Sequence, residues 1–429
     1  MKLISTHNSG HTASFREAVI RGLAPDGGLY MPMQLPRLPN GFLETFASRS
    51  LAEIGYEVSR LFLEDEVPAD ELRHLVEEAC DFSIPLKQLN ENTYVLELFH
   101  GPTLAFKDVG ARFMARLLGY FLRGEDREVT VLAATSGDTG SAVAHGFYNV
   151  PGIRVVILYP KNKVSPLQEK MLTTMGGNIT ALEVEGSFDD CQALVKSAFV
   201  DTDIQKKRTL TSANSINIAR LLPQSFYYFY AAAQLQKQVV FSVPSGNFGN
   251  LTAGLYAQVM GLPVEHFVAA TNANNVFPKY LASGTYTPAP SVQTISNAMD
   301  VGSPSNFSRM QALYPTAEKM REHVWSCSVS DEVTKSTIKK VYEHYNYVCD
   351  PHGAVAYAGL EAYRAQYGSE TMGIFFETAH PVKFSEVVEP IINKTIEVPA
   401  SVEHYLKAKK NAITISKDFT AFKDFLLSH

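Results

Sequence analysis

HGPTLAFKD, residues 100–108, is the stretch from which the fold can be read. It follows an apolar run at Tyr94–Phe99, which predicts a strand that ends at His100. Gly and Pro then break the strand, and the apolar residues beyond Asp108 recur at helical spacing. The stretch therefore predicts a tight turn between a buried strand and a helix.

Lys107 stands at this apolar turn, directly after Phe106. A lysine amine that is removed from water loses its proton more easily, and it then becomes a nucleophile that can form a Schiff base. The alternative is a lysine whose stem is buried while its head group reaches water. These residues alone favour the second interpretation, so the rest of the chain has to decide.

Length and composition describe an ordinary globular protein with a substantial core. The chain has 429 residues, enough for two or three domains, and it is 45% hydrophobic and 19% charged. Its net charge is −6 and its isoelectric point is near 6.1. No basic run is interleaved with aromatic residues, so nucleic acid is not an expected partner.

The four cysteines lie far apart, without a CxxC pair or a histidine at zinc-finger spacing. This pattern predicts a reduced compartment and no structural or catalytic metal. The first residues lack the apolar core of a signal peptide, and no apolar run reaches the roughly 18 residues of a membrane span. We therefore expect a cytoplasmic protein without a membrane partner.

From Thr93 onward, short apolar runs alternate with helical stretches. Continuous apolar runs in this rhythm predict an α/β fold with buried, largely parallel sheets. Ligands of such sheets bind where the strands end and loops lead into helices. The predicted strands are Val129–Ala134, Val155–Tyr159, Ile179–Val184, Val239–Val243, Phe267–Ala270 and Gly373–Phe376.

Two of these strands run into glycine-containing turns that precede helices. Residues 135–140 read TSGDTG, with the following helix expected near Ser141, and residues 244–250 read PSGNFGN. Free backbone N–H groups at a helix start form an anion site, and glycines let the backbone approach a phosphate closely. A helix that is simply well capped by Asp or Thr is the alternative for the first turn. Two such turns in one chain favour the anion sites.

Three more polar features follow the same logic. Asn214, Ser215 and Arg220 lie in SANSINIAR, where a helix start and a guanidinium together suit a phosphate. A capped helix with one surface arginine is an equal alternative. Thr378 closely follows the last predicted strand. Residues 271–310 are rich in Asn, Ser and Pro and predict a long ordered loop.

Together these motifs resemble the threonine synthase family, which consists of pyridoxal-phosphate enzymes of the tryptophan-synthase-β-like fold type II. The resemblance covers nearly the whole chain, and HGPTLAFKD and SANSINIAR are its most specific motifs. The N-terminal unit resembles the fungal and Gram-negative subclass and differs from the plant type. The other matching motifs are GLAPDGGLYMP, ATSGDTGSAVAH, LYPKNKVSPLQEKM, VPSGNFGN, SNAMDVGSPSN and TAHPVKF.

The resemblance implies a role for each polar turn. Lys107 corresponds to the catalytic lysine that bonds to pyridoxal 5′-phosphate, with Phe106 beside the ring. Thr378 corresponds to the hydroxyl that faces the pyridine nitrogen. The cradle of the cofactor phosphate corresponds to Gly246, Asn247, Phe248, Gly249 and Asn250.

The substrate is implied to lie against the other turns. Ser136, Gly137 and Thr139 correspond to the loop that holds the substrate carboxylate, with Asp138 near the cofactor 3′-oxygen. Some relatives have Asn at the position of Asp138, and a carboxylate would repel a phenolate there. Asn214, Ser215 and Arg220 correspond to the pocket for the substrate phosphate.

The resemblance also implies the architecture and the reaction. Two open, largely parallel sheet domains hold the cofactor between them. The expected units are a mostly helical N-terminal unit (1–92), a smaller α/β domain (93–225), a larger α/β domain (226–390) and a helical tail (391–429). The family is a lyase of threonine biosynthesis that converts O-phospho-L-homoserine and water into L-threonine and phosphate by γ-elimination and β-addition. We expect a monomer or a homodimer.

Two other functions remain open at this point. A phospholyase with the same fold would release 2-oxobutyrate from the same substrate. A non-catalytic protein that binds a phosphorylated metabolite would use the same pockets without the chemistry of Lys107.

Overall fold

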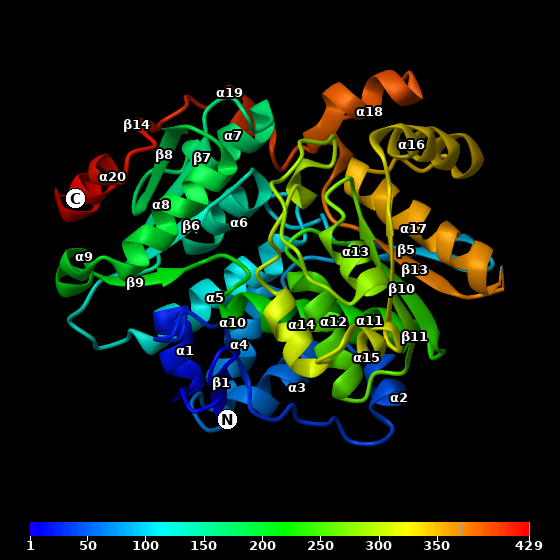
Figure 1. Ribbon diagram of the computed structural model, residues 1–429, viewed down its shortest axis with the longest axis horizontal. Coiled ribbons are helices and arrows are strands. Elements are labelled where there is room, and N and C mark those ends of the chain that lie inside the picture. The colour runs from blue at the N-terminus through cyan, green and yellow to red at the C-terminus, as the bar shows by residue number, and fades with distance from the viewer. Residues whose placement is uncertain (369, 429) are drawn as a thin grey trace.

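The computed structural model describes residues 1–368 and 370–428, and it contains three β-sheets. Two of the sheets form separate lobes, on the left and right of Figure 1, with the N-terminal elements below them. The fold class predicted from the sequence, α/β with two largely parallel sheets, is confirmed.

The smaller lobe is built on a five-stranded sheet in the order β14-β8-β7-β6-β9, in which every pairing is parallel. Its inner strand β6 is buried along its whole length, as its continuous apolar sequence predicts. The strands are β6 (Val129–Ala134), β7 (Ile153–Pro160), β8 (Ile179–Glu185), β9 (Thr209–Ser212) and β14 (Ile413–Ser416). The helices of this lobe are α5 (Lys107–Phe121), α6 (Asp138–Phe147), α7 (Pro166–Thr173), α8 (Phe188–Val200) and α9 (Thr202–Lys207).

The larger lobe is built on a six-stranded sheet in the order β12-β11-β10-β13-β5-β4. Only the edge pairing of β4 with β5 is antiparallel. The strands are β4 (Leu86–Asn90), β5 (Thr93–Glu97), β10 (Val239–Pro244), β11 (Val264–Thr271), β12 (Val324–Ser328) and β13 (Gly373–Glu377). The helices that pack on this sheet or around it include α10 (Ile218–Leu221), α11 (Phe226–Leu235), α12 (Gly249–Val259), α16 (Asp331–Tyr345) and α17 (Pro351–Tyr367).

The N-terminal unit combines helices with a small antiparallel sheet in the order β2-β1-β3. A mostly helical unit was predicted, whereas these strands of two or three residues were not. Helix α3 starts at a capping box between Ser50 and Glu53. The elements are β1 (Leu3–Ser5), β2 (Thr12–Ala13), α1 (Phe15–Arg21), β3 (Tyr30–Pro32), α2 (Phe42–Phe46), α3 (Leu51–Leu63) and α4 (Ala69–Ala79).

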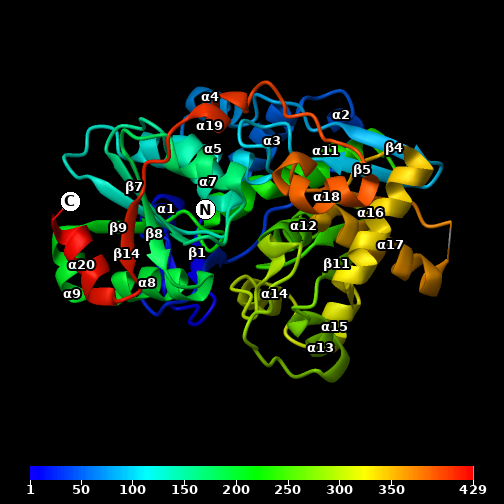
Figure 2. The ribbon, with the colours of Figure 1, turned by 90° about the horizontal axis from the view of Figure 1, so that it is seen from above.

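The chain returns to the smaller lobe after the six-stranded sheet is complete. Helix α18 (Ser385–Ile392) lies on the larger lobe, and the chain then crosses to α19 (Glu403–Lys407), β14 and α20 (Phe419–Ser428) (Figure 2). The predicted helical finish is correct for α19 and α20, but it missed β14, whose sequence ITIS is too short and too polar to stand out.

Residues 271–310 are less irregular than their composition predicts. Helix α13 (Val276–Ser283), the 3₁₀ turn η2 (Asn297–Met299) and the start of α14 (Phe307–Leu313) lie within them. Helix α15 (Ala317–Arg321) and the 3₁₀ turns η1 (Leu222–Ser225) and η3 (Pro381–Phe384) complete the described elements.

Every predicted strand from β6 to β13 is confirmed, with bounds that differ by up to three residues. The strand before HGPTLAFKD is shorter than predicted, because β5 ends at Glu97. The domain limits stay a prediction, and β5 and β13 are neighbours in one sheet although they lie in different predicted units. No helix in the described part of the chain is long and apolar enough to cross a membrane.

Candidate active site

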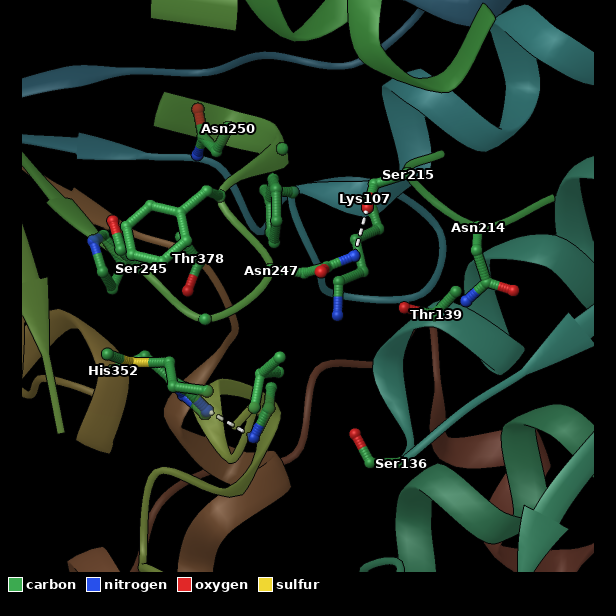
Figure 3. A pocket seen from close by; sticks show the side chains of 18 of the residues that line it. Lys107, Ser136, Thr139, Asn214, Ser215, Ser245, Asn247, Asn250, His352 and Thr378 are labelled. Carbon is green, nitrogen blue, oxygen red and sulfur yellow. Dashed lines mark hydrogen bonds between the residues drawn. The ribbon is translucent and has the colours of Figure 1, made fainter. Parts of the chain in front are cut away.

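The carboxyl ends of strands from both large sheets open onto one cavity between the two lobes. Figure 3 shows Ser245, Asn250 and Thr378 on one side of it, Ser136, Thr139 and Asn214 on the other, and Lys107 between them. The predicted site residues that line the cavity are Phe106, Lys107, Ser136, Thr139, Asn214, Ser215, Arg220, Gly246, Asn247, Phe248, Gly249, Asn250 and Thr378.

Lys107 is the first residue of α5 and is held in place by the turn that contains Thr378. The N–H of Phe106 donates to the carbonyl of Thr378 at 2.9 Å, and Ala105 forms an antiparallel bridge with Ala379. The Tyr227 hydroxyl also donates to the carbonyl of Phe106 at 2.9 Å. These bonds explain how two turns about 270 residues apart in sequence face one cavity.

The pKa of the Lys107 amine suits a nucleophile and a base. Burial, together with the positive charges of Lys383 and Arg220, lowers its pKa to about 8 against the opposing effect of Asp138. A base works best when its pKa lies close to the operating pH. The surroundings of Lys107 therefore do not favour a lysine with a solvated head group.

The turn at residues 245–250 presents backbone rather than charge to the cavity. Helix α12 begins at Gly249 and no side chain caps its start, so the N–H groups of its first turn are free to bind an anion. Phe248 takes a left-handed backbone conformation with φ of 58°, which is uncommon for a bulky residue. A Cβ at Gly246 would lie 2.7 Å from the Cα of Met299, so only glycine fits there.

Two buried donors, on residues that line this cavity, have no partner within the described chain. They are the Nδ2 of Asn250 and the Nε of Arg220. A buried donor without a partner costs free energy, and an anionic group bound at that position would satisfy it. The residues therefore fit a bound group that carries anionic oxygens on each side of Lys107.

Arg220 forms the charged wall of the cavity. It is 3% exposed, and burial lowers the pKa of its guanidinium to about 10, which leaves it protonated at neutral pH. Its Nη1 donates to the carbonyl of Ala213 at 2.6 Å, which fixes the head group. Such a fixed guanidinium suits recognition of a phosphate.

The predicted helix start at Asn214 and Ser215 is wrong. Helix α10 begins at Ile218 with Asn217 as its N-cap, because Asn217 accepts from the N–H of Ala219. Asn214 instead bonds both backbone groups of Ala134 at the end of β6. Ser215 accepts from Asn247 at 2.8 Å (Figure 3). This bond directly joins the two regions expected to bind anions, which are residues 245–250 and the segment from Asn214 to Arg220.

The TSGDTG turn also differs from its prediction. Helix α6 begins at Asp138, three residues before Ser141, and its N-cap is Gly137 without a side-chain cap. The N-cap is therefore neither Asp nor Thr, although the Thr135 hydroxyl accepts from the N–H groups of Gly137 and Gly140 at 2.9 and 2.8 Å. Ser136 and Thr139 line the cavity, whereas Gly137 and Asp138 are not among its described lining residues.

The Asp138 carboxylate lies beside the cavity and is bonded to two neighbouring side chains. Its Oδ1 lies 2.5 Å from the Nζ of Lys383 and accepts from Gln168 at 2.8 Å. Lys383 and its neighbours hold the Asp138 pKa at about 2 against the effect of burial, so the carboxylate is charged. Its contact with the cofactor stays a prediction.

Two site residues were not found by the sequence reasoning. His352 lines the cavity, and its Nδ1 lies 2.5 Å from Asp350 while its Nε2 accepts from the N–H of Ala298. Lys383 pairs with Asp138 but follows a proline in TAHPVKF, where it resembles a surface lysine of a short turn. The sequence DPH before an apolar helical run was a usable signal for His352, since Asp350 caps α17.

Comparison with known proteins identifies the family. The models described as "Threonine synthase N terminus", "Pyridoxal-phosphate dependent enzyme" and "Threonine synthase, C-terminal" match residues 2–80, 81–377 and 353–426. The threonine synthase of Haemophilus influenzae is 45% identical over 431 residues, which cover all of both chains. The chain belongs to the threonine synthase family.

Solved threonine synthases share the whole fold. The Escherichia coli enzyme superposes with a TM-score of 0.94 at 42% identity and full coverage of both chains. The Brucella melitensis threonine synthase, solved with bound pyridoxal phosphate, gives 0.92 at 33% identity and covers 100% of this chain and 99% of its own. The predicted family, its fungal and Gram-negative subclass and its dependence on pyridoxal phosphate are confirmed.

Proposed function

We propose that this threonine synthase converts O-phospho-L-homoserine and water into L-threonine and phosphate, with one phosphate held on each side of Lys107. The observation that carries the proposal is the pair of unpartnered buried donors, Asn250 Nδ2 and Arg220 Nε, on two residues that line one cavity with Lys107. A cofactor phosphate and a substrate phosphate together would satisfy both.

The cofactor site is assigned to the larger lobe. Gly246 to Asn250 would hold the phosphate through backbone N–H groups and the Asn250 amide, and Phe106 would lie beside the ring. Thr378 would face the pyridine nitrogen with a neutral hydroxyl. When bound, pyridoxal phosphate supplies a carbonyl for Lys107 and withdraws electrons from the substrate α-carbon.

The substrate site is assigned to the smaller lobe. Ser136, Gly137 and Thr139 would hold the α-carboxylate at the start of α6, where the N-cap residue is a glycine without a capping side chain and Thr135 accepts from the N–H groups of Gly137 and Gly140. Arg220, Asn214 and Ser215 would hold the γ-phosphate. We place Asp138 beside this loop, as the partner of Lys383, and its contact with the cofactor oxygen remains part of the proposal.

In this proposal, Lys107 removes and returns the proton of the substrate Cα. With a pKa near 8, its amine takes the proton from the substrate Cα at neutral to mildly alkaline pH and returns a proton to that atom before threonine leaves. Arg220 remains charged throughout and stabilises the departing phosphate, whose oxygens can accept a proton.

The competing reaction is elimination without addition of water, which releases 2-oxobutyrate. Purified holoenzyme supplied with O-phospho-L-homoserine should form threonine and phosphate in equal amounts, with 2-oxobutyrate as a minor product. Predominant 2-oxobutyrate would identify a phospholyase instead. A protein that binds the substrate and forms neither product would identify a binding protein.

If the departing phosphate also relays protons, added phosphate should change the ratio of threonine to 2-oxobutyrate. An unchanged ratio would remove the relay from the proposal and leave the reaction itself intact.

A further inference from the structure

Lys383 is a fully buried lysine that belongs to neither anion-binding region. It lies in η3, just after the strand β13 and the Thr378 turn, and its side chain has 0% exposure. Burial of a charged lysine is unfavourable unless partners surround it. Its contacts therefore show what the charge is used for.

The Lys383 ammonium joins three segments of the site. It lies 2.5 Å from Asp138 Oδ1, at the start of α6 in the smaller lobe. It donates to the carbonyl of Thr103 at 2.8 Å, in the turn that leads into Lys107. Its own backbone belongs to the turn that carries Thr378. One side chain thus connects the lysine turn, the substrate turn and the ring-nitrogen turn.

The partners of Lys383 are themselves fixed. Thr103 donates through its N–H and its hydroxyl to the buried carboxylate of Asp108, at 2.9 and 2.5 Å. Gln168 is fully buried and donates to Asp138, and it packs so closely on Gly137 that a Cβ there would lie 2.5 Å from it. The ion pair is therefore the centre of a rigid network and not a mobile surface contact.

We propose that Lys383 is a positioning residue of the reaction, whose ammonium holds the turn of Lys107 and the turn of residues 136–139 in register across the cavity. The proposal rests on the proposed function only in taking Lys107 as the residue that bonds to the cofactor. Nothing in the position of Lys383 requires it to touch the substrate.

The pair also sets the charge around Lys107. Three charged side chains act on the Lys107 amine: Asp138 raises its pKa, and Lys383 and Arg220 lower it. Asp108 and His380 are the other titratable groups near Lys383. Removal of Lys383 alone leaves Asp138 unopposed and favours the protonated Lys107 nitrogen, whereas removal of Asp138 alone has the opposite effect.

The test is a pH titration of the visible absorbance of the holoenzyme, which follows protonation of the Lys107 nitrogen. We expect Lys383→Met to move the midpoint to higher pH and Asp138→Asn to move it to lower pH, each by about one pH unit. The double variant should return towards the wild-type midpoint, because both charges are gone. We expect kcat of Lys383→Met to fall about 100-fold, as for a misplaced reacting group.

Two further variants separate positioning from simple stability. Lys383→Arg keeps the charge and should recover part of kcat with a midpoint close to wild type. Lys410→Met removes another paired lysine, bonded to Glu169 and Glu183 outside the cavity, and should leave the midpoint unchanged. If Lys383→Met fails to fold, the double variant and Lys383→Arg still give midpoints.

Midpoints that do not move, or that move in the same direction in Lys383→Met and Asp138→Asn, would overturn the proposal. Equal loss of kcat in Lys383→Arg and Lys383→Met would also count against it. The titration needs no substrate, so it decides the role of Lys383 even if the wild-type enzyme forms no threonine, a result that would contradict the proposed function alone.

Discussion

The two proposed anion-binding regions of the cavity, residues 245–250 and the surroundings of Arg220, are built by different physical means. The turn at residues 245–250 contains no charged side chain and relies on the backbone of a helix start, packed so tightly that Gly246 admits no Cβ. The region around Arg220 relies instead on one buried guanidinium in a helix of four residues. A backbone cradle suits a cofactor that stays bound, while a single cation suits a phosphate that must be released in every cycle.

The first prediction, with the largest expected effect, tests whether Lys107 serves both regions. Lys107→Ala should lower threonine formation by at least about 10⁴-fold, because it removes both the bond to the cofactor and the base. The visible absorbance of the holoenzyme should disappear in the same variant. Lys410→Met serves as the control, since Lys410 is paired outside the cavity. An active Lys107→Ala variant would contradict the assignment.

The second prediction concerns the charged region alone. Arg220→Ala should lower kcat/KM for O-phospho-L-homoserine by roughly 30-fold or more, since loss of a buried charge contact costs on the order of 2–5 kcal/mol. Its visible absorbance should match that of the wild type. Loss of the cofactor signal would show that Arg220 belongs to the cofactor site instead.

The third prediction concerns the backbone region alone. Gly246→Ala places a methyl group 2.7 Å from the Cα of Met299, and relief of this overlap should shift the cradle. Overpacking of this kind costs about 1–3 kcal/mol, so cofactor affinity should fall about 10-fold or more. With the cofactor at saturation, KM for the substrate should change little. A variant with unaltered cofactor affinity would refute the cradle.

The smallest expected effect is a shift with pH. The unprotonated Lys107 amine is the nucleophile and its pKa is about 8, so the rate of cofactor uptake by the cofactor-free chain should rise as pH increases through about 8 and then level off. Arg220 lowers this pKa, so Arg220→Ala should move the midpoint to higher pH. A midpoint near the ordinary lysine value in the wild type would contradict the burial of the amine.

The same contrast explains what the sequence could predict. The turn at residues 245–250 was predictable because strand, glycines and helix start are consecutive, and helix α12 begins at the second glycine, Gly249. The Arg220 region was located correctly, but its predicted helix start was wrong, because Asn214 bonds to β6, a contact distant in sequence. Lys383 was missed for the same reason, since its partners Asp138 and Thr103 lie more than 240 residues away.

The secondary structure was also predictable only where the local sequence carries a clear pattern. Strands β6, β10 and β13, which are inner strands of their sheets, show as continuous apolar runs and were predicted. The edge strands β12 and β14 were not, because half-exposed strands carry mixed sequences such as VWSCS and ITIS.

Inhibition of the holoenzyme by inorganic phosphate tests the central claim, that two separate regions bind two phosphates, most directly. In the wild type, phosphate should compete with O-phospho-L-homoserine. Arg220→Ala should weaken this inhibition by roughly 30-fold or more. Phosphate should inhibit cofactor-saturated Gly246→Ala as strongly as it inhibits the wild type. Equal inhibition of the wild type and Arg220→Ala, or weakened inhibition in Gly246→Ala alone, would contradict the account.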